Sequence, residues 1–155
     1  PHIYGDIEVQ NEEDVKKDWE IIKQQESEKG TLAGVPKSLP SLVKAIRIQE
    51  KARGVGFYWD EKSQVWDKVQ EELQEFKEAP TAEEREKEFG DLMFSLINYA
   101  RFENINPAYA LELTNKKFIK RFNYLEEKTK EKGETLSSLT LKEMDVYWEE
   151  AKQME

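Results

Sequence analysis

The chain has 155 residues, a net charge of −9 and no cysteine, which fits a single domain and excludes disulfides and zinc–thiolate sites. Hydrophobic and charged residues each make up 37% of the chain and aromatic residues 11%, a composition typical of long amphipathic helices with charged outer faces. An acidic surface disfavours direct nucleic acid binding. No apolar run is long enough to span a bilayer. The absence of cysteine suits a reducing compartment, so we expect a cytoplasmic protein.

The N-terminal part of the chain is separated from the rest by a linker. Residues 3–9 alternate as a strand would, without an evident partner strand, and residues 12–29 carry apolar side chains at helical spacing. Residues 31–37 contain glycine and proline and predict a linker. We therefore expect residues 1–34 to form a connecting segment with one helix, and residues 35–155 to form the principal domain.

Two helices are predicted next. The first follows Ser38 as its cap, tolerates Pro40 in its first turn and ends at Gly54 and Gly56. The second covers residues 61–78, where apolar residues recur at helical spacing.

Capping signals then mark the remaining helices. A capping box at residues 81–84 predicts a helix that ends near Glu103, and Asn106 followed by Pro107 predicts the start of the next one. A second capping box at residues 140–143 begins a terminal helix. The predicted fold class is all-α: a four-helix bundle with additional N- and C-terminal helices.

Four acidic residues stand out on the two consecutive helices around Pro80. Glu72 and Glu75 are three residues apart on one helix, and Glu88 and Asp91 have the same spacing on the next, so each pair projects from one helical face. Both pairs border apolar stripes, and the short connection makes the helices antiparallel neighbours. Converging carboxylates without histidine or thiolate favour Mg²⁺, with Mn²⁺ as the alternative.

A solvated acidic surface is the competing interpretation, since the chain has 33 acidic residues. Two pairs on adjacent helices favour the metal site over that alternative. Gly90, inside a helix beside the acids, predicts close packing or access, because glycine costs a helix about 1 kcal/mol relative to alanine. Glu71 lies beside these acids and is a candidate to orient a water molecule or to act as a base; an exposed glutamate is the alternative.

The acidic motif resembles the metal motif of the MazG family of all-α nucleoside triphosphate pyrophosphohydrolases, which has Glu72-x-x-Glu75 followed after twelve residues by Glu88-x-x-Asp91. Further segments are similar to that family: residues 35–40, 49–52, 55–59, 90–94, 98–101, 115–122 and 144–150. The resemblance covers about residues 35–153. Residues 2–6 resemble the segment that joins two tandem MazG domains, so the chain resembles the C-terminal catalytic domain with its connecting segment.

The resemblance implies Mg²⁺-dependent hydrolysis of nucleoside triphosphates to a nucleoside monophosphate and pyrophosphate, with the four acids as metal ligands and the chain as a homodimer. It also implies substrate-binding residues: Lys117, Arg121, Asn115 and Trp148, with Lys120 beside them. By this resemblance the two basic side chains at 117 and 121 bind the triphosphate and the tryptophan stacks on the nucleobase. Phe57 and Trp59 are expected in the core, or alternatively in the nucleotide pocket.

Three functions compatible with these residues stay open. The first is a pyrophosphohydrolase with broad base specificity that cleans or controls nucleotide pools. The second is a pyrophosphohydrolase for one nucleotide, dUTP-like or phosphoribosyl-linked. The third is a non-enzymatic helical module that senses nucleotides or binds a partner.

Overall fold

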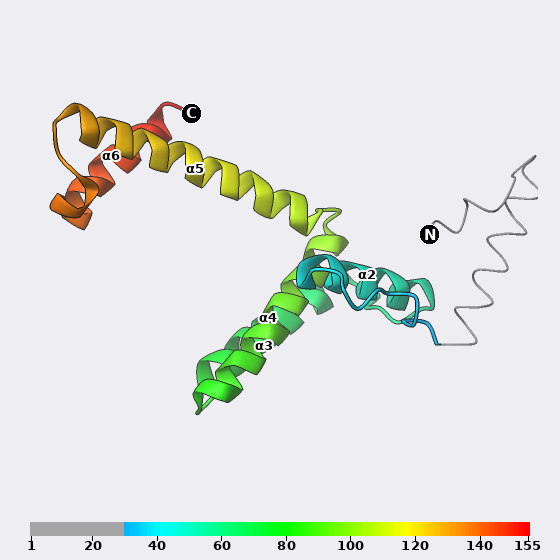
Figure 1. Cartoon of the computed structure of the whole chain (residues 1–155). Coiled ribbons are helices and arrows are strands. Elements are labelled where there is room, and N and C mark those ends of the chain that lie inside the picture. Colours follow the sequence, from blue (N-terminus) through cyan, green and yellow to red (C-terminus); the bar gives the residue numbers. More distant parts are fainter. Residues whose placement is uncertain (1–29) are drawn as a thin grey trace, which may run out of the picture. The chain divides into compact units, whose positions relative to one another are not determined.

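The computed structural model describes residues 30–155, so the predicted strand-like segment 3–9 and helix 12–29 lie outside the described residues. All regular elements of the described residues are helices, without strands, which confirms the predicted all-α class. Its elements are α2 (Ser41–Gly54), α3 (Lys62–Glu78), α4 (Ala82–Phe102), α5 (Pro107–Glu131), the short 3₁₀ helix η2 (Leu136–Ser138) and α6 (Leu141–Gln153) (Figure 1).

The described residues fall into two compact units, one that ends at Asn104 and one that spans Ile105–Glu155. The first unit holds α2, α3 and α4, and the second holds α5, η2 and α6. Asn104 has φ of 59°, in the left-handed region that asparagine tolerates better than most residues. The packing of α5 with α2–α4 as a four-helix bundle stays a prediction, as does the domain boundary at residues 34–35.

An antiparallel pair of helices, α3 and α4, forms the body of the first unit (Figure 1). The connection at Pro80 is short, and Thr81 Oγ1 then accepts a hydrogen bond from the Glu84 backbone N–H at 3.1 Å. This cap satisfies one of the donors left free at a helix start. The predicted helix start and the predicted antiparallel arrangement are both confirmed.

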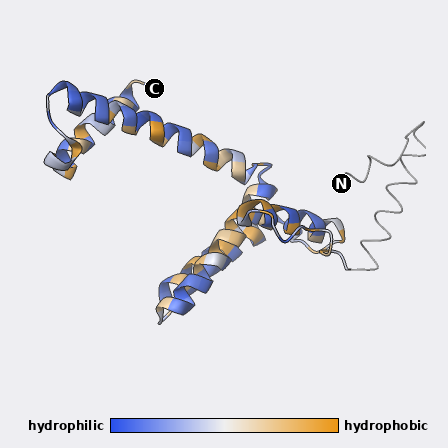
Figure 2. Cartoon of the chain, in the orientation of Figure 1, coloured by the Kyte–Doolittle hydropathy of each residue, from blue (hydrophilic) through white to orange (hydrophobic). Residues whose placement is uncertain are grey.

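The core between α3 and α4 is small. Val65, Val69, Leu92 and Ile97 are buried, and burying each such side chain stabilises the fold by about 1.5–3 kcal/mol. The predicted stripe continues to Leu73, but that residue is 39% exposed. Figure 2 shows the α3–α4 pair hydrophilic near its turn and more hydrophobic towards the C-terminal half of α4.

The predicted start of α2 is wrong. Ser38 does not cap the helix, which begins at Ser41 with Pro40 as its N-cap residue in an extended conformation, φ −55° and ψ 145°. The reason is local sterics: the residue that precedes a proline, here Leu39, is disfavoured in the helical region. The helix therefore begins only after the proline.

The end of α2 matters for the site because it places the loop 57–59. Gly56 adopts φ of +90°, its N–H donates to Arg53 O at 2.9 Å, and the Phe57 N–H donates to Ala52 O at 3.0 Å. This pair of bonds is the Schellman arrangement, which a residue without Cβ adopts readily. The predicted stop at this glycine is confirmed.

In the second unit α6 packs on α5 (Figure 1). Asn106 Oδ1 accepts from the Tyr109 N–H at 3.1 Å. At the start of α6, Thr140 Oγ1 accepts from the Glu143 N–H at 3.1 Å, and the Thr140 N–H donates to Glu143 Oε1 at 2.9 Å. The second predicted capping box is thus complete.

Apolar residues recur at helical spacing along α5, but of four such residues only one is buried. Leu125 is 3% exposed, whereas Leu111, Phe118 and Phe122 expose 52%, 55% and 38%. Within residues 30–155, no helix combines the length and the apolar character that a membrane span requires.

Candidate functional site

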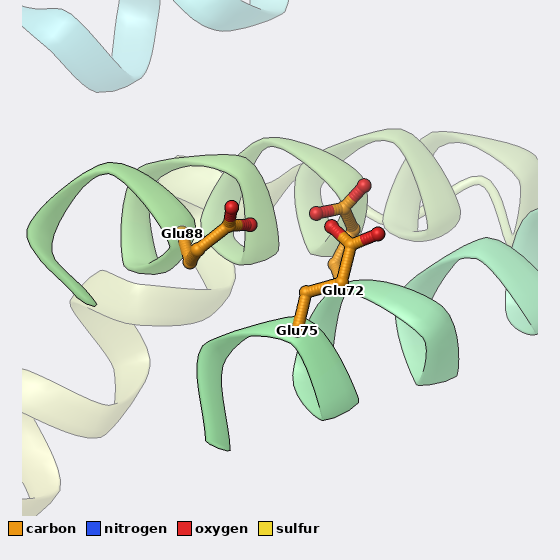
Figure 3. Close-up of side chains that lie close together, drawn as sticks. All are labelled: Glu72, Glu75 and Glu88. Atoms are coloured by element: carbon orange, nitrogen blue, oxygen red, sulfur yellow. The ribbon is translucent and has the colours of Figure 1, made fainter. Parts of the chain in front are cut away.

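Three of the four predicted metal ligands converge between α3 and α4. Glu72, Glu75 and Glu88 each place a carboxylate oxygen within 4.8 Å of the other two (Figure 3). Opposite oxygens around an octahedral Mg²⁺ ion lie about 4.2 Å apart, given metal–oxygen distances near 2.1 Å. The spacing of the three oxygens is therefore close to that of ligands on one cation.

The other two acids considered from the sequence lie differently. Asp91 falls outside the group of three, but it lines the same cavity as Glu72. Glu71 also falls outside the group: it is exposed and pairs with Lys68 at 3.2 Å. The structure therefore brings together three acids, keeps the fourth on the cavity wall and gives Glu71 a lysine partner.

Burial of carboxylate oxygens in this acidic group costs free energy unless they find a partner. Glu72 is only 6% exposed; its Oε1 pairs with Lys68 Nζ at 3.0 Å. Its Oε2 is buried and has no hydrogen-bond partner among residues 30–155, and the same holds for Glu88 Oε2. Leaving a buried charged acceptor unsatisfied costs about 1–3 kcal/mol or more. A divalent cation, which prefers oxygen ligands, fits these two orphan oxygens.

The charges at the site also favour a bound cation. The pKa of Glu75 is raised above its usual value, chiefly by the charge of Glu72, then by desolvation and by the charge of Glu88. The pKa of Lys68 is also raised, because its ammonium donates hydrogen bonds to Glu72 and Glu71. Repulsion among the carboxylates thus favours protonation of Glu75, and a bound cation would relieve the same repulsion.

Gly90 does not serve close packing. No heavy atom of the described residues lies within 4 Å of the position where a Cβ would stand, so that half of the prediction is wrong. The space beside the acids is open at this point of α4, which leaves access as the interpretation of this glycine.

A cavity of about 730 Å³ adjoins the acids in the first unit. Its wall contains Glu72 and Asp91, and also Phe57, Trp59 and Phe94. The expectation of core burial for the first two aromatics is wrong, because they are 82% and 44% exposed. They line the cavity, and their place in a nucleotide pocket stays a prediction.

Gln49 connects α2 to this cavity. Its Nε2–H donates to the backbone oxygen of Phe94 on α4 at 2.9 Å. The side chain is 6% exposed, and its Oε1 accepts no hydrogen bond from any described residue. A buried amide oxygen without a partner is uncommon in folded proteins.

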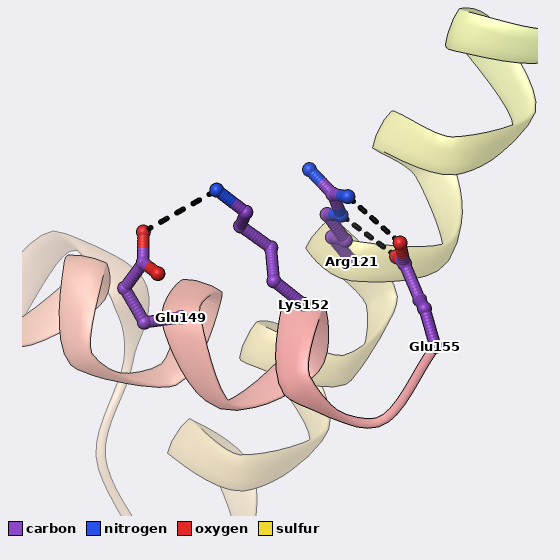
Figure 4. Close-up of polar contacts among 4 residues, drawn as sticks. All are labelled: Arg121, Glu149, Lys152 and Glu155. Carbon is purple, nitrogen blue, oxygen red and sulfur yellow. Dashed lines mark hydrogen bonds and ion pairs between the residues drawn. The ribbon is translucent and has the colours of Figure 1, made fainter.

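The predicted basic residues lie in the second unit. Arg121 forms a two-bonded ion pair with Glu155, with Nε and a terminal nitrogen each 2.7 Å from a carboxylate oxygen (Figure 4). The pKa of Glu155 is lowered first by its hydrogen bonds to Arg121 and further by the charges of Lys120 and Lys117. Three of the predicted cations therefore act on one anionic group.

The remaining predicted substrate residues have partners in the same unit. Trp148 packs against Phe118, with ring centroids 5.0 Å apart, and the guanidinium of Arg121 lies 5.7 Å from its ring centroid. Asn115 Nδ2 donates to Glu112 at 3.4 Å. Trp148 thus lies beside Arg121, and its stacking on a nucleobase stays a prediction.

Sequence reasoning missed two residues of the first unit. Lys68 lies three and four residues before Glu71 and Glu72, so helical spacing was a usable signal for this ion pair. Gln49 begins the segment 49–52 that resembles the MazG family, but its bond to Phe94 had no local signal, because it joins residues 45 positions apart.

Replacing Glu75 by Gln should stabilise the metal-free protein at pH 7, because the substitution removes the repulsion that raises the pKa of this carboxyl. A carboxyl whose pKa is raised in the folded state contributes stability at pH values below the ordinary glutamate pKa of about 4.3. This contribution is lost as the pH rises through the pKa of the folded state. The stabilising effect of Glu75→Gln should therefore be present at pH 7 and vanish below about pH 4.

Urea unfolding in EDTA at both pH values measures this effect. Glu86→Gln, at an exposed position of α4, is the charge-matched control and should leave the unfolding free energy unchanged. A Glu75→Gln variant less stable than the wild type at pH 7 would contradict the repulsion.

Several curated proteins are similar to this chain in sequence. It is 41% identical over 155 residues to the nucleoside triphosphate pyrophosphohydrolase/pyrophosphatase MazG of Thermotoga maritima, across 98% of this chain and 59% of that protein. It is 33% identical over 164 residues to the Escherichia coli K12 nucleoside triphosphate pyrophosphohydrolase, across 100% and 62%. It is 48% identical over 162 residues to the uncharacterized protein YabN of Bacillus subtilis, across 100% and 33%.

The chain thus spans only part of each relative, from 33% to 62% of its length. No protein-family model matches it. The similarity nevertheless covers 98% or more of this chain, including the acidic helices α3 and α4. The chain is therefore a MazG-like all-α domain, homologous to part of the MazG nucleoside triphosphate pyrophosphohydrolases.

Proposed function

We propose that the domain hydrolyses nucleoside triphosphates to a nucleoside monophosphate and pyrophosphate, with Mg²⁺ or Mn²⁺ as the required cation. The observation that carries this proposal is the group of Glu72, Glu75 and Glu88, with two buried oxygens that lack a partner among the described residues. The names of two relatives, both nucleoside triphosphate pyrophosphohydrolases, support the reaction class.

The acids hold the cation in this proposal, with Asp91 as the fourth ligand from the cavity wall. The cation, when bound, supplies positive charge to the triphosphate oxygens and to the attacking water. Water oxygen bonds to the α-phosphorus while the bond from that phosphorus to the bridging oxygen of the pyrophosphate breaks. Glu71 stays a candidate to orient that water, which would require it to leave Lys68.

The basic cluster supplies the charge that a triphosphate requires. Lys117 and Arg121, with Lys120 beside them, bind phosphate oxygens in our proposal, and the carboxylate of Glu155 stands where such an anion would pair. An arginine bound through two nitrogens suits phosphate as well as carboxylate. Asn115 adds a neutral hydrogen-bond donor for the phosphate oxygens. Stacking of Trp148 on the nucleobase stays a prediction.

The remaining parts of the proposal concern base specificity, physiological role and location in the cell. We propose that several bases are accepted, that the enzyme cleans or controls nucleotide pools, and that it acts in the cytoplasm. A panel of ribo- and deoxyribonucleotides tests the base range. Strong preference for a dUTP-like or phosphoribosyl-nucleotide would replace broad specificity with the narrower alternative.

We also propose a homodimer. Large apolar side chains stand exposed on α4, including Phe89, Met93 and Leu96 at 48%, 47% and 45%. Burial of such a face against a second copy would add apolar area that the small core of one chain lacks.

Glu88→Gln and Asp91→Asn should each lower turnover on the order of a hundredfold or more, because each removes a negative ligand while preserving shape. Chromatography of the products from each triphosphate, with Mg²⁺ or Mn²⁺, measures the loss. Circular dichroism should show an unchanged helical content. Glu86→Gln is the control and should keep wild-type turnover.

Two outcomes would reject the enzyme proposal. One is release of orthophosphate and a diphosphate in place of pyrophosphate. The other is absence of turnover by the wild type with both cations, which would favour the nucleotide-sensing alternative.

Glu155→Gln should bind inorganic tripolyphosphate several-fold more tightly than the wild type, because Arg121 loses its competing carboxylate. Arg121→Lys should bind it more weakly, since lysine cannot form the two-nitrogen contact. Calorimetry with Ca²⁺ measures both affinities. Glu131→Gln, which breaks the ion pair with Lys128, changes the charge equally and should have no effect.

Light scattering should give a mass about twice the 18.3 kDa of one chain. Met93→Glu should shift the mass towards one chain, because it places a charge in the proposed apolar interface. Lys87→Glu, a substitution at an exposed site on the same helix, serves as the control. A wild-type mass of one chain at all concentrations would exclude the dimer.

A further inference from the structure

Lys68 pairs with the buried member of the acidic group. Its Nζ lies 3.0 Å from Glu72 Oε1 and 3.2 Å from Glu71 Oε2. The other oxygen of the Glu72 carboxylate, Oε2, is buried and has no hydrogen-bond partner among residues 30–155. The two oxygens of this carboxylate thus differ: an ammonium holds one of them, and the other is left over.

This contact has more weight than a surface ion pair. The side chain of Glu72 is 8% exposed, whereas that of Lys68 is 40% exposed. Solvent screens a partly buried pair less than it screens two exposed side chains. On a helix, a lysine four residues before a glutamate is also less favourable than the reverse order. The buried carboxylate is therefore the reason for the contact.

Lys68 is also the cation in direct contact with this group. Glu75 and Glu88 are its other members, and within the described part of the chain neither forms an ion pair with a lysine or an arginine. Lys68 and Glu72 line the same cavity. The contact can therefore affect how the group binds a cation.

The number of oxygens that a carboxylate offers influences which divalent cation it suits. Ca²⁺ takes about six to eight oxygens at roughly 2.3–2.6 Å and accepts both oxygens of one carboxylate. Mg²⁺ is smaller, keeps a near-octahedral geometry at about 2.0–2.1 Å and retains several waters. A carboxylate that offers a single oxygen, because an ammonium engages the other, suits Mg²⁺ better than Ca²⁺.

We propose that Lys68 is a positioning residue that restricts Glu72 to one metal-binding oxygen and so favours Mg²⁺ over Ca²⁺ at the acidic group. The proposal rests on the cation site proposed above and adds what selects the cation. Hydrogen-bond partners outside the ligand set commonly orient metal-binding carboxylates and change their affinity for the metal. Lys68 has this role towards Glu72.

Displacement of Mn²⁺ measures this preference in the nucleotide-free protein. Bound Mn²⁺ loses the sharp electron paramagnetic resonance signal of the free ion, and added Mg²⁺ or Ca²⁺ restores the signal as it displaces Mn²⁺. Each titration yields a dissociation constant. The selectivity is the constant for Ca²⁺ divided by the constant for Mg²⁺, and it should exceed one in the wild type.

Lys68→Met should bind both cations more tightly, because a positive charge leaves the site. Ca²⁺ should gain about tenfold more than Mg²⁺, since both oxygens of Glu72 become available to it. The selectivity should therefore fall about tenfold. Lys68→Gln removes the same charge but leaves a polar neighbour for the buried carboxylate. It should lower the selectivity as well, and it replaces Lys68→Met if that variant fails to fold.

Two matched variants separate the contact from the loss of charge. Lys68→Arg retains a positive hydrogen-bond donor and should keep the selectivity of the wild type. Lys87→Met removes a positive charge one residue before Glu88, where the lysine pairs with Glu83 at 3.8 Å. This variant should change both affinities by the same factor and leave the selectivity unchanged.

Three results would overturn the role of Lys68. They are a wild type without preference for Mg²⁺, an equal gain for both cations in the folded Lys68→Met or Lys68→Gln protein, and a fall in selectivity in Lys87→Met. Pyrophosphate release with unchanged selectivity in the Lys68 variants rejects this inference alone. The expected fall in selectivity in a protein that releases no pyrophosphate rejects the proposed reaction alone.

Discussion

Repulsion among carboxylates at the α3–α4 interface is the constraint on which the site depends. Glu72, Glu75 and Glu88 lie within 4.8 Å of one another, and Lys68 offsets only part of their charge. A helix pair with so small an apolar core tolerates this arrangement at a cost in stability, as functional sites often do. The same repulsion makes the group receptive to a divalent cation.

The two units contribute different chemistry. The first has acids, an aromatic cavity and the buried amide of Gln49, which suit a cation and a ring. The second has Arg121 with neighbouring lysines, which suit phosphate oxygens. The similarity to MazG pyrophosphohydrolases extends over both units, since it covers 98% or more of the chain.

Local signals made most of the fold predictable. Thr81 and Thr140 start helices through bonds to residues three positions on, so their prediction needed no tertiary information. Ser38 failed because a proline two residues later restricts the backbone more strongly than a cap favours it. The short connection at Pro80 made the convergence of three of the four acids predictable, while Asp91 lies outside the group. The orphan oxygen of Gln49 was not predictable, because it depends on the carbonyl of Phe94 in another helix.

Hydrolysis of a nucleoside triphosphate in ¹⁸O-labelled water is the most direct test of the reaction assigned to these acids. Attack on the α-phosphorus predicts that the label appears in the nucleoside monophosphate and is absent from pyrophosphate. Phosphorus NMR or mass spectrometry locates the label in the products. Label in pyrophosphate, or in orthophosphate released beside a nucleoside diphosphate, would contradict the account.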